Sequence, residues 1–360
     1  MATSSITQAE NTTGTGTQQA IISADSHVIE DPDLWVKRLP AVYREQAPQF
    51  PPLKEGGQFQ GVSGGNDPHK RIEEMTVDGV SAEVLYSSFT MTLFGMEDAR
   101  LQEACFGVFN DWLIEYCQAA TDRLIGVAAI SLYDTEGAVK ELERCRKMGL
   151  RGAQIWLVPH AALPFTSNHY DPFWQAAQDL DMPVSLHTVT GWGATKDGVW
   201  YLPQIEQLRY AAIGTMTEGQ CALFDLVMGR ALDRYPRLKL VLVENEVGWL
   251  PYFLQAWDKG LLHRRRRGGA DKLPLDLMPS EYFERQVFAT LLKDHAGCQA
   301  LSWWGQDNCM WSNDFPHNST TWPDSRQIID RDLGHLSPET RAKIVYGNVR
   351  RLYGLDLPEV

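Results

Sequence analysis

The sequence predicts an α/β fold, a distorted (β/α)8 TIM barrel, and two observations support that prediction. Eight short apolar runs alternate with longer amphipathic stretches, which is the strand–helix alternation of a parallel sheet. No glycine-rich phosphate loop follows the first run, so a closed barrel is favoured over an open doubly wound sheet. The predicted strands are Ala20–Ala24, Ala82–Tyr86, Leu124–Leu132, Gly152–Val158, Pro183–His187, Leu238–Val243, Gln286–Ala289 and Cys309–Ser312.

Helical sequence lies between most of these runs. In the stretch Glu97–Ala120, apolar residues recur at helical spacing. Near the end of the chain, Ser337 followed by Pro338 is typical of a helix N-terminus, with serine as the N-cap and proline in the first turn. We expect that helix to stop near Gly354.

Residues 31–75 interrupt the alternation, because they carry Pro32, Pro40, Pro48, Pro51 and Pro52 together with two glycine pairs. We interpret them as an irregular excursion after strand one that lies near the barrel mouth and could cover it. Residues 1–19 are predicted to form a disordered polar tail. The absence of a repeat or a linker predicts that residues 20–360 form a single domain.

The bulk composition restricts the class of partner. The net charge of −13 argues against nucleic acid or an anionic membrane surface as the main partner. No stretch of about 18 apolar residues exists, so no membrane span is expected. The six cysteines are scattered, which is typical of buried thiols in a reducing compartment. Together with the lack of a secretory signal, this predicts a cytoplasmic protein that acts on a small molecule.

Acidic and imidazole side chains fall at the carboxyl ends of predicted strands. Asp25 and His27 end the first strand, His187 ends the fifth, and Asp314 follows the eighth. In a barrel these ends form one face, so we predict that the four side chains converge on one divalent ion per chain. Two imidazoles and two carboxylates suit Zn²⁺ first and Mn²⁺ second, with a position left open and no organic cofactor.

Each of these residues also has a plainer interpretation. An isolated Asp-x-His is more often a cap or a turn, a single histidine can be a hydrogen-bonded core residue, and Asp314 could be a helix N-cap. Their joint placement at strands one, five and eight favours the metal site. Four tryptophans at or after strand ends predict an aromatic substrate pocket, namely Trp35, Trp156, Trp192 and Trp200.

Several segments resemble a known family over most of the chain. They are Ala24–Glu30 with the sequence ADSHVIE, Arg71–Met75 with RIEEM, and Trp311–His317 with WSNDFPH. The sequence is similar to the amidohydrolase-related branch of the amidohydrolase superfamily, which includes aminocarboxymuconate-semialdehyde decarboxylase and gamma-resorcylate decarboxylase. The resemblance implies the distorted barrel, the ligand set Asp25, His27, His187 and Asp314, and a homodimer.

One departure from the family concerns strand six, where many members place a histidine that acts in proton transfer. This sequence has Glu244 at or beside that position. Glu244 could shuttle a proton if its site raises the pKa, bind the metal, or hold a neighbouring side chain as a buried carboxylate. His317, three residues beyond Asp314, either orients a ligand or is a surface histidine.

Three functions fit these residues. The first is non-oxidative decarboxylation of an aromatic or conjugated carboxylic acid, with a proton delivered to the carbon that loses CO₂. The second is metal-assisted hydrolysis of an amide, a lactone or a C–C bond, with Asp314 as the base. The third is a barrel that uses the metal for structure only. The resemblance favours decarboxylation over hydrolysis. The lack of a histidine at the end of strand six makes this preference weaker.

Overall fold

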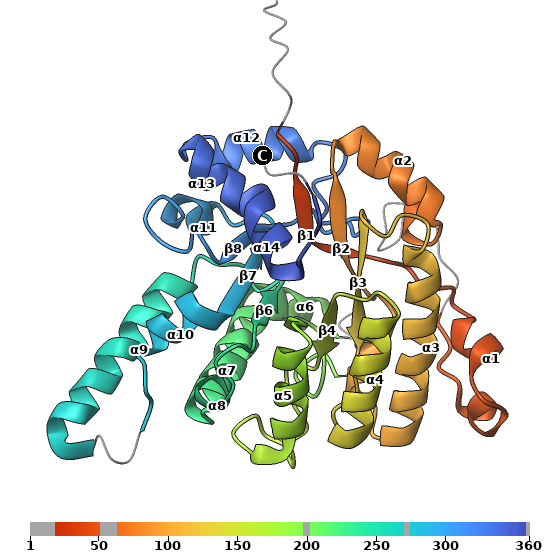
Figure 1. Cartoon of the computed structure of the whole chain (residues 1–360), viewed down its shortest axis with the longest axis horizontal. Coiled ribbons are helices and arrows are strands. Elements are labelled where there is room, and N and C mark those ends of the chain that lie inside the picture. The colour runs from red at the N-terminus through yellow and green to blue at the C-terminus, as the bar shows by residue number, and fades with distance from the viewer. Residues whose placement is uncertain (1–18, 51–62, 197–201, 270–273, 358–360) are drawn as a thin grey trace, which may run out of the picture.

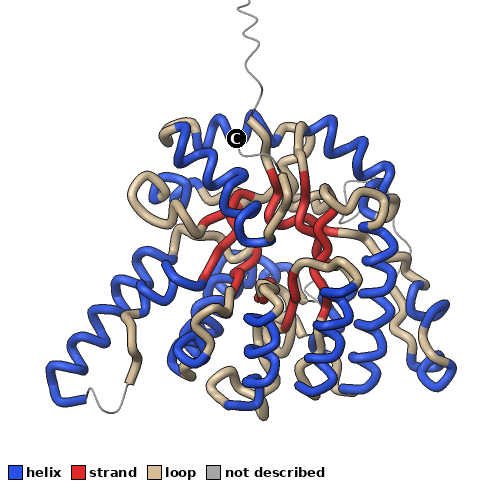
Figure 2. The backbone as a smooth tube through the Cα atoms, viewed as in Figure 1, coloured by secondary structure: helices blue, strands red, loops and turns tan. Residues whose placement is uncertain are grey.

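A computed structural model describes residues 19–50, 63–196, 202–269 and 274–357. In it, eight parallel strands follow one another around a barrel in chain order, with helices outside them (Figures 1 and 2). This confirms the predicted (β/α)8 barrel. The strands are β1 (Ile22–His27), β2 (Ala82–Tyr86), β3 (Leu124–Ala129), β4 (Gly152–Ile155), β5 (Val184–His187), β6 (Leu240–Val243), β7 (Val287–Leu291) and β8 (Cys309–Trp311).

All eight predicted strands are present, and their bounds differ by a few residues. The first strand extends past Ala24 to His27, while the third and fourth end three residues earlier than predicted, at Ala129 and Ile155. Every strand residue is buried. Strands that are buried on both faces have nearly continuous apolar sequences, so their positions could be predicted from the sequence.

The helices surround the barrel. In chain order they are α1 (Leu34–Arg38), α2 (Pro68–Asp78), α3 (Ala99–Cys117), α4 (Thr135–Lys147), α5 (Asp171–Asp179), α6 (Gln204–Arg209), α7 (Thr215–Met228), α8 (Ala231–Arg234), α9 (Leu250–Arg264), α10 (Pro279–Gln286), α11 (His295–Ala300), α12 (Ser325–Leu333), α13 (Pro338–Ala342) and α14 (Asn348–Tyr353). Short 3-10 or π segments add Ala41–Gln46, Ser63–Gly65, Thr90–Gly95, Asn168–Tyr170, Tyr210–Gly214, Arg265–Gly269 and Lys343–Gly347.

Helix ends follow the capping residues of the sequence. Asp98 accepts hydrogen bonds from the backbone at the start of α3, and Ser337 does so at the start of α13. Gly354 ends α14 in the left-handed region at φ 58°, where glycine carries no Cβ penalty. The predicted stop at this glycine is confirmed.

The excursion after β1 is shorter than predicted. Asp67 caps α2, which begins at Pro68 and supplies the helix before β2, so the irregular part ends before residue 75. Helix α1 also lies within it. Residues 1–18 of the predicted tail and residues 51–62 lie outside the described residues, and the role of the excursion as a cover stays a prediction.

The barrel closes between β1 and β8. The Asp314 N–H donates to the Asp25 carbonyl at 3.0 Å, and the His27 N–H donates to the Phe315 carbonyl at 2.6 Å. Between Ser23 and Ser26 the pairing of β1 with β2 slips by one residue. The closing hydrogen bonds therefore come from the same short segments that carry the predicted metal ligands.

Two features of the chain's chemistry are also visible. All six cysteines are free, and five of them are buried. Cys221, on the outer helix α7, is exposed, so the prediction that all six are buried is wrong for this residue. Among the described helices, none is both long and apolar enough to cross a bilayer. The cytoplasmic location stays a prediction.

Candidate metal centre

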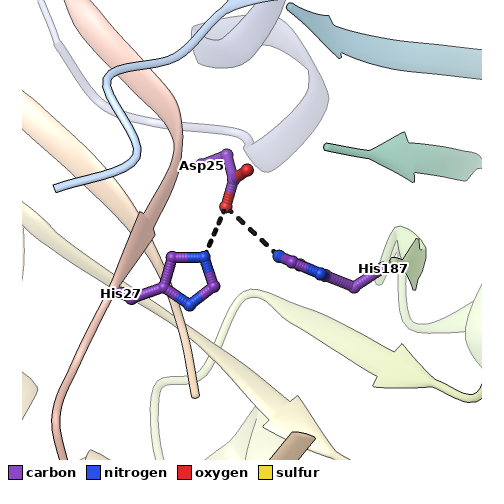
Figure 3. Close-up of side chains that lie close together, drawn as sticks. All are labelled: Asp25, His27 and His187. Carbon is purple, nitrogen blue, oxygen red and sulfur yellow. Dashed lines mark ion pairs between the residues drawn. The ribbon is translucent and has the colours of Figure 1, made fainter. Parts of the chain in front are cut away.

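Four of the residues predicted as ligands come together at the carboxyl ends of three strands. Asp25 and His27 lie at the end of β1, His187 is the last residue of β5, and Asp314 follows β8. Each side chain is at most 1% exposed. Figure 3 shows the Asp25 carboxylate between the two imidazole rings.

The facing atoms lie at similar separations. Asp25 Oδ1 is 3.5 Å from His27 Nε2 and 3.6 Å from His187 Nε2 (Figure 3). Asp314 Oδ1 is 3.5 Å from His27 Nε2. These distances exceed those of a strong charge-assisted hydrogen bond, so these groups do not bind one another tightly. Asp25, His27 and His187 lie close enough to share one ion, and Asp314 lies close to His27 and His317.

The two histidines are oriented by backbone carbonyls. His27 Nδ1 lies 2.7 Å from the Ser87 carbonyl, and His187 Nδ1 lies 3.0 Å from the Thr188 carbonyl. A carbonyl only accepts, so each Nδ1 carries hydrogen and each Nε2 directs a lone pair to the centre when the ring is neutral. Metal-binding histidines are held in this way in known sites.

The centre contains buried polar atoms that the described residues leave without a hydrogen-bond partner. They are both carboxylate oxygens of Asp25 and the Nε2 atoms of His27 and His187. A buried polar atom left unsatisfied costs about 1–3 kcal/mol. A divalent cation would satisfy all of them at once, and the mixture of imidazole and carboxylate suits Zn²⁺ or Mn²⁺. The residues therefore fit the predicted metal.

The electrostatics of the protein alone point the same way. Burial raises the pKa of Asp25, although His187 opposes the rise. Burial also lowers the pKa of His27 well below its usual value, and His317 and His187 lower it further. Burial lowers the pKa of His187, but Asp25 outweighs it and raises the pKa to about 9. The Asp25 carboxylate thus stabilises a positive charge on His187, whereas burial and the neighbouring histidines disfavour one on His27.

Three of the strand ends around the centre carry strained backbone. Val189 after β5, Glu244 after β6 and Asp314 after β8 have φ values of 67°, 58° and 51°. Residues with a Cβ in this region cost on the order of 1–3 kcal/mol each and concentrate at functional sites. No local pattern in the sequence signals this strain, because none of these residues is glycine.

Glu244 directly follows β6 and borders the centre. Its Oε2 accepts a hydrogen bond from Thr188 Oγ1 at 2.9 Å and lies 3.9 Å from His187 Nδ1. Burial and the Asp314 carboxylate raise the pKa of Glu244 to about 7, although its side chain is still 31% exposed. A bound dication would lower that pKa again. Glu244 has no arginine or lysine within ion-pair distance among the described residues.

His317 packs against the centre on the side of β8. Its Nδ1 lies 2.9 Å from Asp314 Oδ1, and its ring stacks on His27 with 4.0 Å between centroids. Its Nε2 is 3.3 Å from Ser88 Oγ. Burial opposes protonation, but the Asp314 carboxylate raises the pKa of His317. Of the two interpretations of His317, this position fits the one in which it orients Asp314.

Comparison with known proteins identifies the family. The family model for amidohydrolases matches residues 33–355, which is most of the chain. The chain belongs to the amidohydrolase family. Both the fold and the family that the sequence predicted are therefore confirmed.

Named members of this family include decarboxylases. Gamma-resorcylate decarboxylase of Polaromonas sp. is 28% identical over 313 residues, covering 80% of this chain and 87% of the relative. The 2-amino-3-carboxymuconate-6-semialdehyde decarboxylase of Dictyostelium discoideum is 23% identical over 294 residues, covering 81% and 77%. A dihydroxybenzoic acid decarboxylase of Polaromonas sp., solved with manganese and 2-nitroresorcinol, has a TM-score of 0.67 at 20% identity, covering 95% of this chain and 98% of the other. That structural likeness supports the barrel fold.

Of the four tryptophans predicted to line an aromatic pocket, the structure describes three, and two of these, Trp35 and Trp156, are buried in the core, so the pocket stays a prediction. Trp156 follows β4 and packs edge-on against Tyr133, with ring centroids 5.1 Å apart. The Trp192 indole N–H donates to the Tyr133 hydroxyl at 3.1 Å, and this tryptophan is partly exposed. Trp35 is fully buried and donates to the Cys105 carbonyl at 3.1 Å, so it packs as a core residue and its predicted contact with substrate gains no support. Trp200 lies outside the described residues.

Sequence reasoning missed a buried ion pair beneath the centre. Arg71 of α2 pairs with Glu83 of β2, and both are at most 1% exposed. The Arg71 guanidinium also donates to the carbonyls of His27 at 2.6 Å and Phe315 at 3.4 Å. Asn313 donates to the other Glu83 oxygen at 2.9 Å. Two features of the sequence could have indicated this pair. Arg71 lies in a segment that resembles the family, and Glu83 is a charged residue inside an apolar strand.

Proposed function

We propose that this amidohydrolase is a divalent-metal-dependent, non-oxidative decarboxylase of an aromatic or conjugated carboxylic acid. The observation that carries the proposal is the converging set of unpartnered acceptor atoms on Asp25, His27 and His187, with Asp314 beside them. The relatives with this family's barrel are named as decarboxylases of such acids. No organic cofactor is needed for the reaction.

Asp25, His27, His187 and Asp314 would hold the ion. Bound there, it would hold and polarise a carboxylate or hydroxyl oxygen of the substrate. The donor set accommodates either Zn²⁺ or Mn²⁺, and the manganese in the Polaromonas decarboxylase structure supports testing Mn²⁺ alongside zinc.

The chain's own acids supply the proton that the reaction consumes. The bond between the ring carbon and the carboxylate breaks, its electron pair stays on the carbon, and CO₂ leaves. A proton must then reach that carbon. We assign it to Glu244, because its carboxyl group borders the centre and its partial exposure allows it to regain a proton from water. The Asp314–His317 pair is the second acid–base group, and His317 orients Asp314.

Aromatic walls and a cation favour an aromatic acid. Trp156 and Trp192 share the Tyr133 contact, and Lys196 Nζ lies 4.3 Å from the centroid of the Trp192 ring. A flat substrate ring could pack against the partly exposed Trp192 indole, while the lysine attracts its negative charge.

The experiment that tests this function measures which isotope from the solvent, deuterium or ¹⁸O, is incorporated into the product. The metal-loaded protein is incubated in D₂O with dihydroxybenzoic and other aromatic carboxylic acids. Release of CO₂ with one deuterium at the vacated carbon is expected. Incorporation of ¹⁸O from labelled water into a cleaved amide, lactone or diketone, without CO₂, would instead establish the hydrolase.

We also propose that the protein assembles as a homodimer through its exposed apolar helices. Ile205 and Leu208 on α6 and Ile213 just after it are 64%, 65% and 54% exposed. Large exposed apolar side chains gathered on one surface are typical of an interface. Sedimentation velocity should give the mass of two chains, and Leu208→Glu should shift it toward one. A monomer at all concentrations would contradict this assembly.

A further inference from the structure

A cavity of about 590 Å³ lies at the amino-terminal ends of the strands, opposite the candidate metal centre. Its lining includes Arg151, Lys239 and Asn308, which directly precede β4, β6 and β8. Helix α14, which lies in front of the strands in Figures 1 and 2, contributes the segment 351–353. The metal ligands sit at the other ends of the strands, so this cavity is separate from the proposed reaction site.

The cavity is strongly cationic in a protein whose net charge is −13. Six cationic and three anionic side chains line it. Of the cations, Arg237 pairs with Asp179 at 2.5 Å. Within the described part of the chain, the other five have no carboxylate within ion-pair distance, and they are Arg146, Arg151, Lys239, Arg285 and Arg351. Of the anions, Asp307 pairs with Lys343, and Asp181 and Glu284 are exposed.

Backbone carbonyls hold these cations in place without neutralising them. Lys239 Nζ donates to the Arg285 carbonyl at 2.7 Å, Arg285 donates to the Leu232 carbonyl at 2.8 Å, and Arg351 donates to the Asp307 carbonyl. A lysine has three donors and an arginine five, so donors remain for a ligand. Burial, then the charges of Arg351 and Arg285, lower the pKa of Lys239, and Asp181 only partly opposes this shift, as expected where cations outnumber carboxylates.

We propose that this cavity binds a small organic anion that carries two or more phosphate or carboxylate groups. Guanidinium groups recognise both kinds of group through paired N–H donors. Ala177, Met182 and Phe288 add apolar wall for the organic part of the ligand. The volume lies within the range of about 300–1,000 Å³ that is usual for small-molecule sites.

The test is isothermal titration calorimetry of the full-length, metal-loaded protein at low ionic strength. Fructose 1,6-bisphosphate and propane-1,2,3-tricarboxylate serve as the phosphate and carboxylate probes. At least one should bind with a stoichiometry of one per chain, and its affinity should fall as salt is added. The probe that binds more tightly identifies the chemical class of the anion. Absence of binding by both would overturn the proposal.

Three single substitutions locate the binding. Arg351→Gln and Lys239→Gln should each weaken it about tenfold or more, since each removes a charge-assisted contact. Arg331→Gln is the matched control, because Arg331 is an exposed cation of α12 that pairs with Asp332 outside the cavity. Arg351 is exposed, so its variant should fold even if Lys239→Gln does not. Equal affinities in Arg351→Gln and Arg331→Gln would place the anion elsewhere and refute the assignment.

Discussion

Replacing Arg71 with methionine should both destabilise the barrel and weaken metal binding. The substitution removes the partner of the buried Glu83 carboxylate and the donors to the His27 and Phe315 carbonyls. Breaking a buried ion pair on one side costs about 3–5 kcal/mol. Removing groups that orient a metal ligand typically lowers metal affinity about 10–100-fold. We therefore expect both effects from one side chain.

The matched control is Arg38→Met. Arg38 also pairs with a glutamate, Glu115, here through two hydrogen bonds, but the two side chains are 40% and 58% exposed. An exposed pair contributes about 0–1 kcal/mol, so this variant should lose little stability and no metal affinity. Urea unfolding measures the first quantity, and competition with a chromophoric chelator measures the second.

A double variant, Arg71→Met with Glu83→Met, separates the two roles of Arg71. It removes both buried charges, so much of the lost stability should return. The carbonyls of His27 and Phe315 still lack their donor, so metal affinity should stay low. If Arg71→Met costs no more stability than Arg38→Met, the buried pair is not the stabilising element. If both Arg71 variants bind metal as the wild type does, the pair does not orient the ligands.

Three further predictions concern the centre itself. Protein purified without chelator should contain close to one Zn or Mn per chain by elemental analysis. When metal is returned to the stripped protein at about 100 times its Kd, the free energy of unfolding should rise by about 2.7 kcal/mol. An unchanged thermal unfolding temperature would argue against a metal site. His187→Ala and Asp314→Asn should each lose metal and most activity while circular dichroism shows a folded barrel; retained metal would exclude that residue as a ligand. Glu244→Gln should keep its metal but lose about 10²–10⁴-fold in kcat, whereas Glu143→Gln, the control at an exposed glutamate of α4, should lose little. A near-normal rate in Glu244→Gln would leave Glu244 structural.

The sequence predicted the strands and the convergence of the candidate ligands because both follow from local pattern plus barrel topology. Continuous apolar runs marked the strands, and strand ends placed Asp25, His187 and Asp314 on one face. The geometry of individual side chains was beyond that reasoning. Trp35 follows strand one, yet the chain turns it into the core against Cys105.

Pairing between side chains of different elements could not be predicted from the sequence either. Arg71 and Glu83 belong to different elements, and only the packing of α2 against the strands brings them together beneath β1 and β8. The cationic cavity gathers residues from positions 146 to 351 that share no motif. A helix start at Pro68 was visible in principle, since Asp67 before it is a typical N-cap. The proline-rich composition of the preceding residues masked it.

The hydrogen bonds that close the barrel between Asp25 and Asp314, and between His27 and Phe315, also determine when the centre can exist during synthesis. The ribosome makes the β8 side of this seam almost 290 residues after the β1 side, as the separation of Ser23 from its partner Asn313 shows. Until then the nascent chain has an open sheet and an incomplete ligand set. Stable metal capture would therefore report that the last strand of the barrel has joined its first.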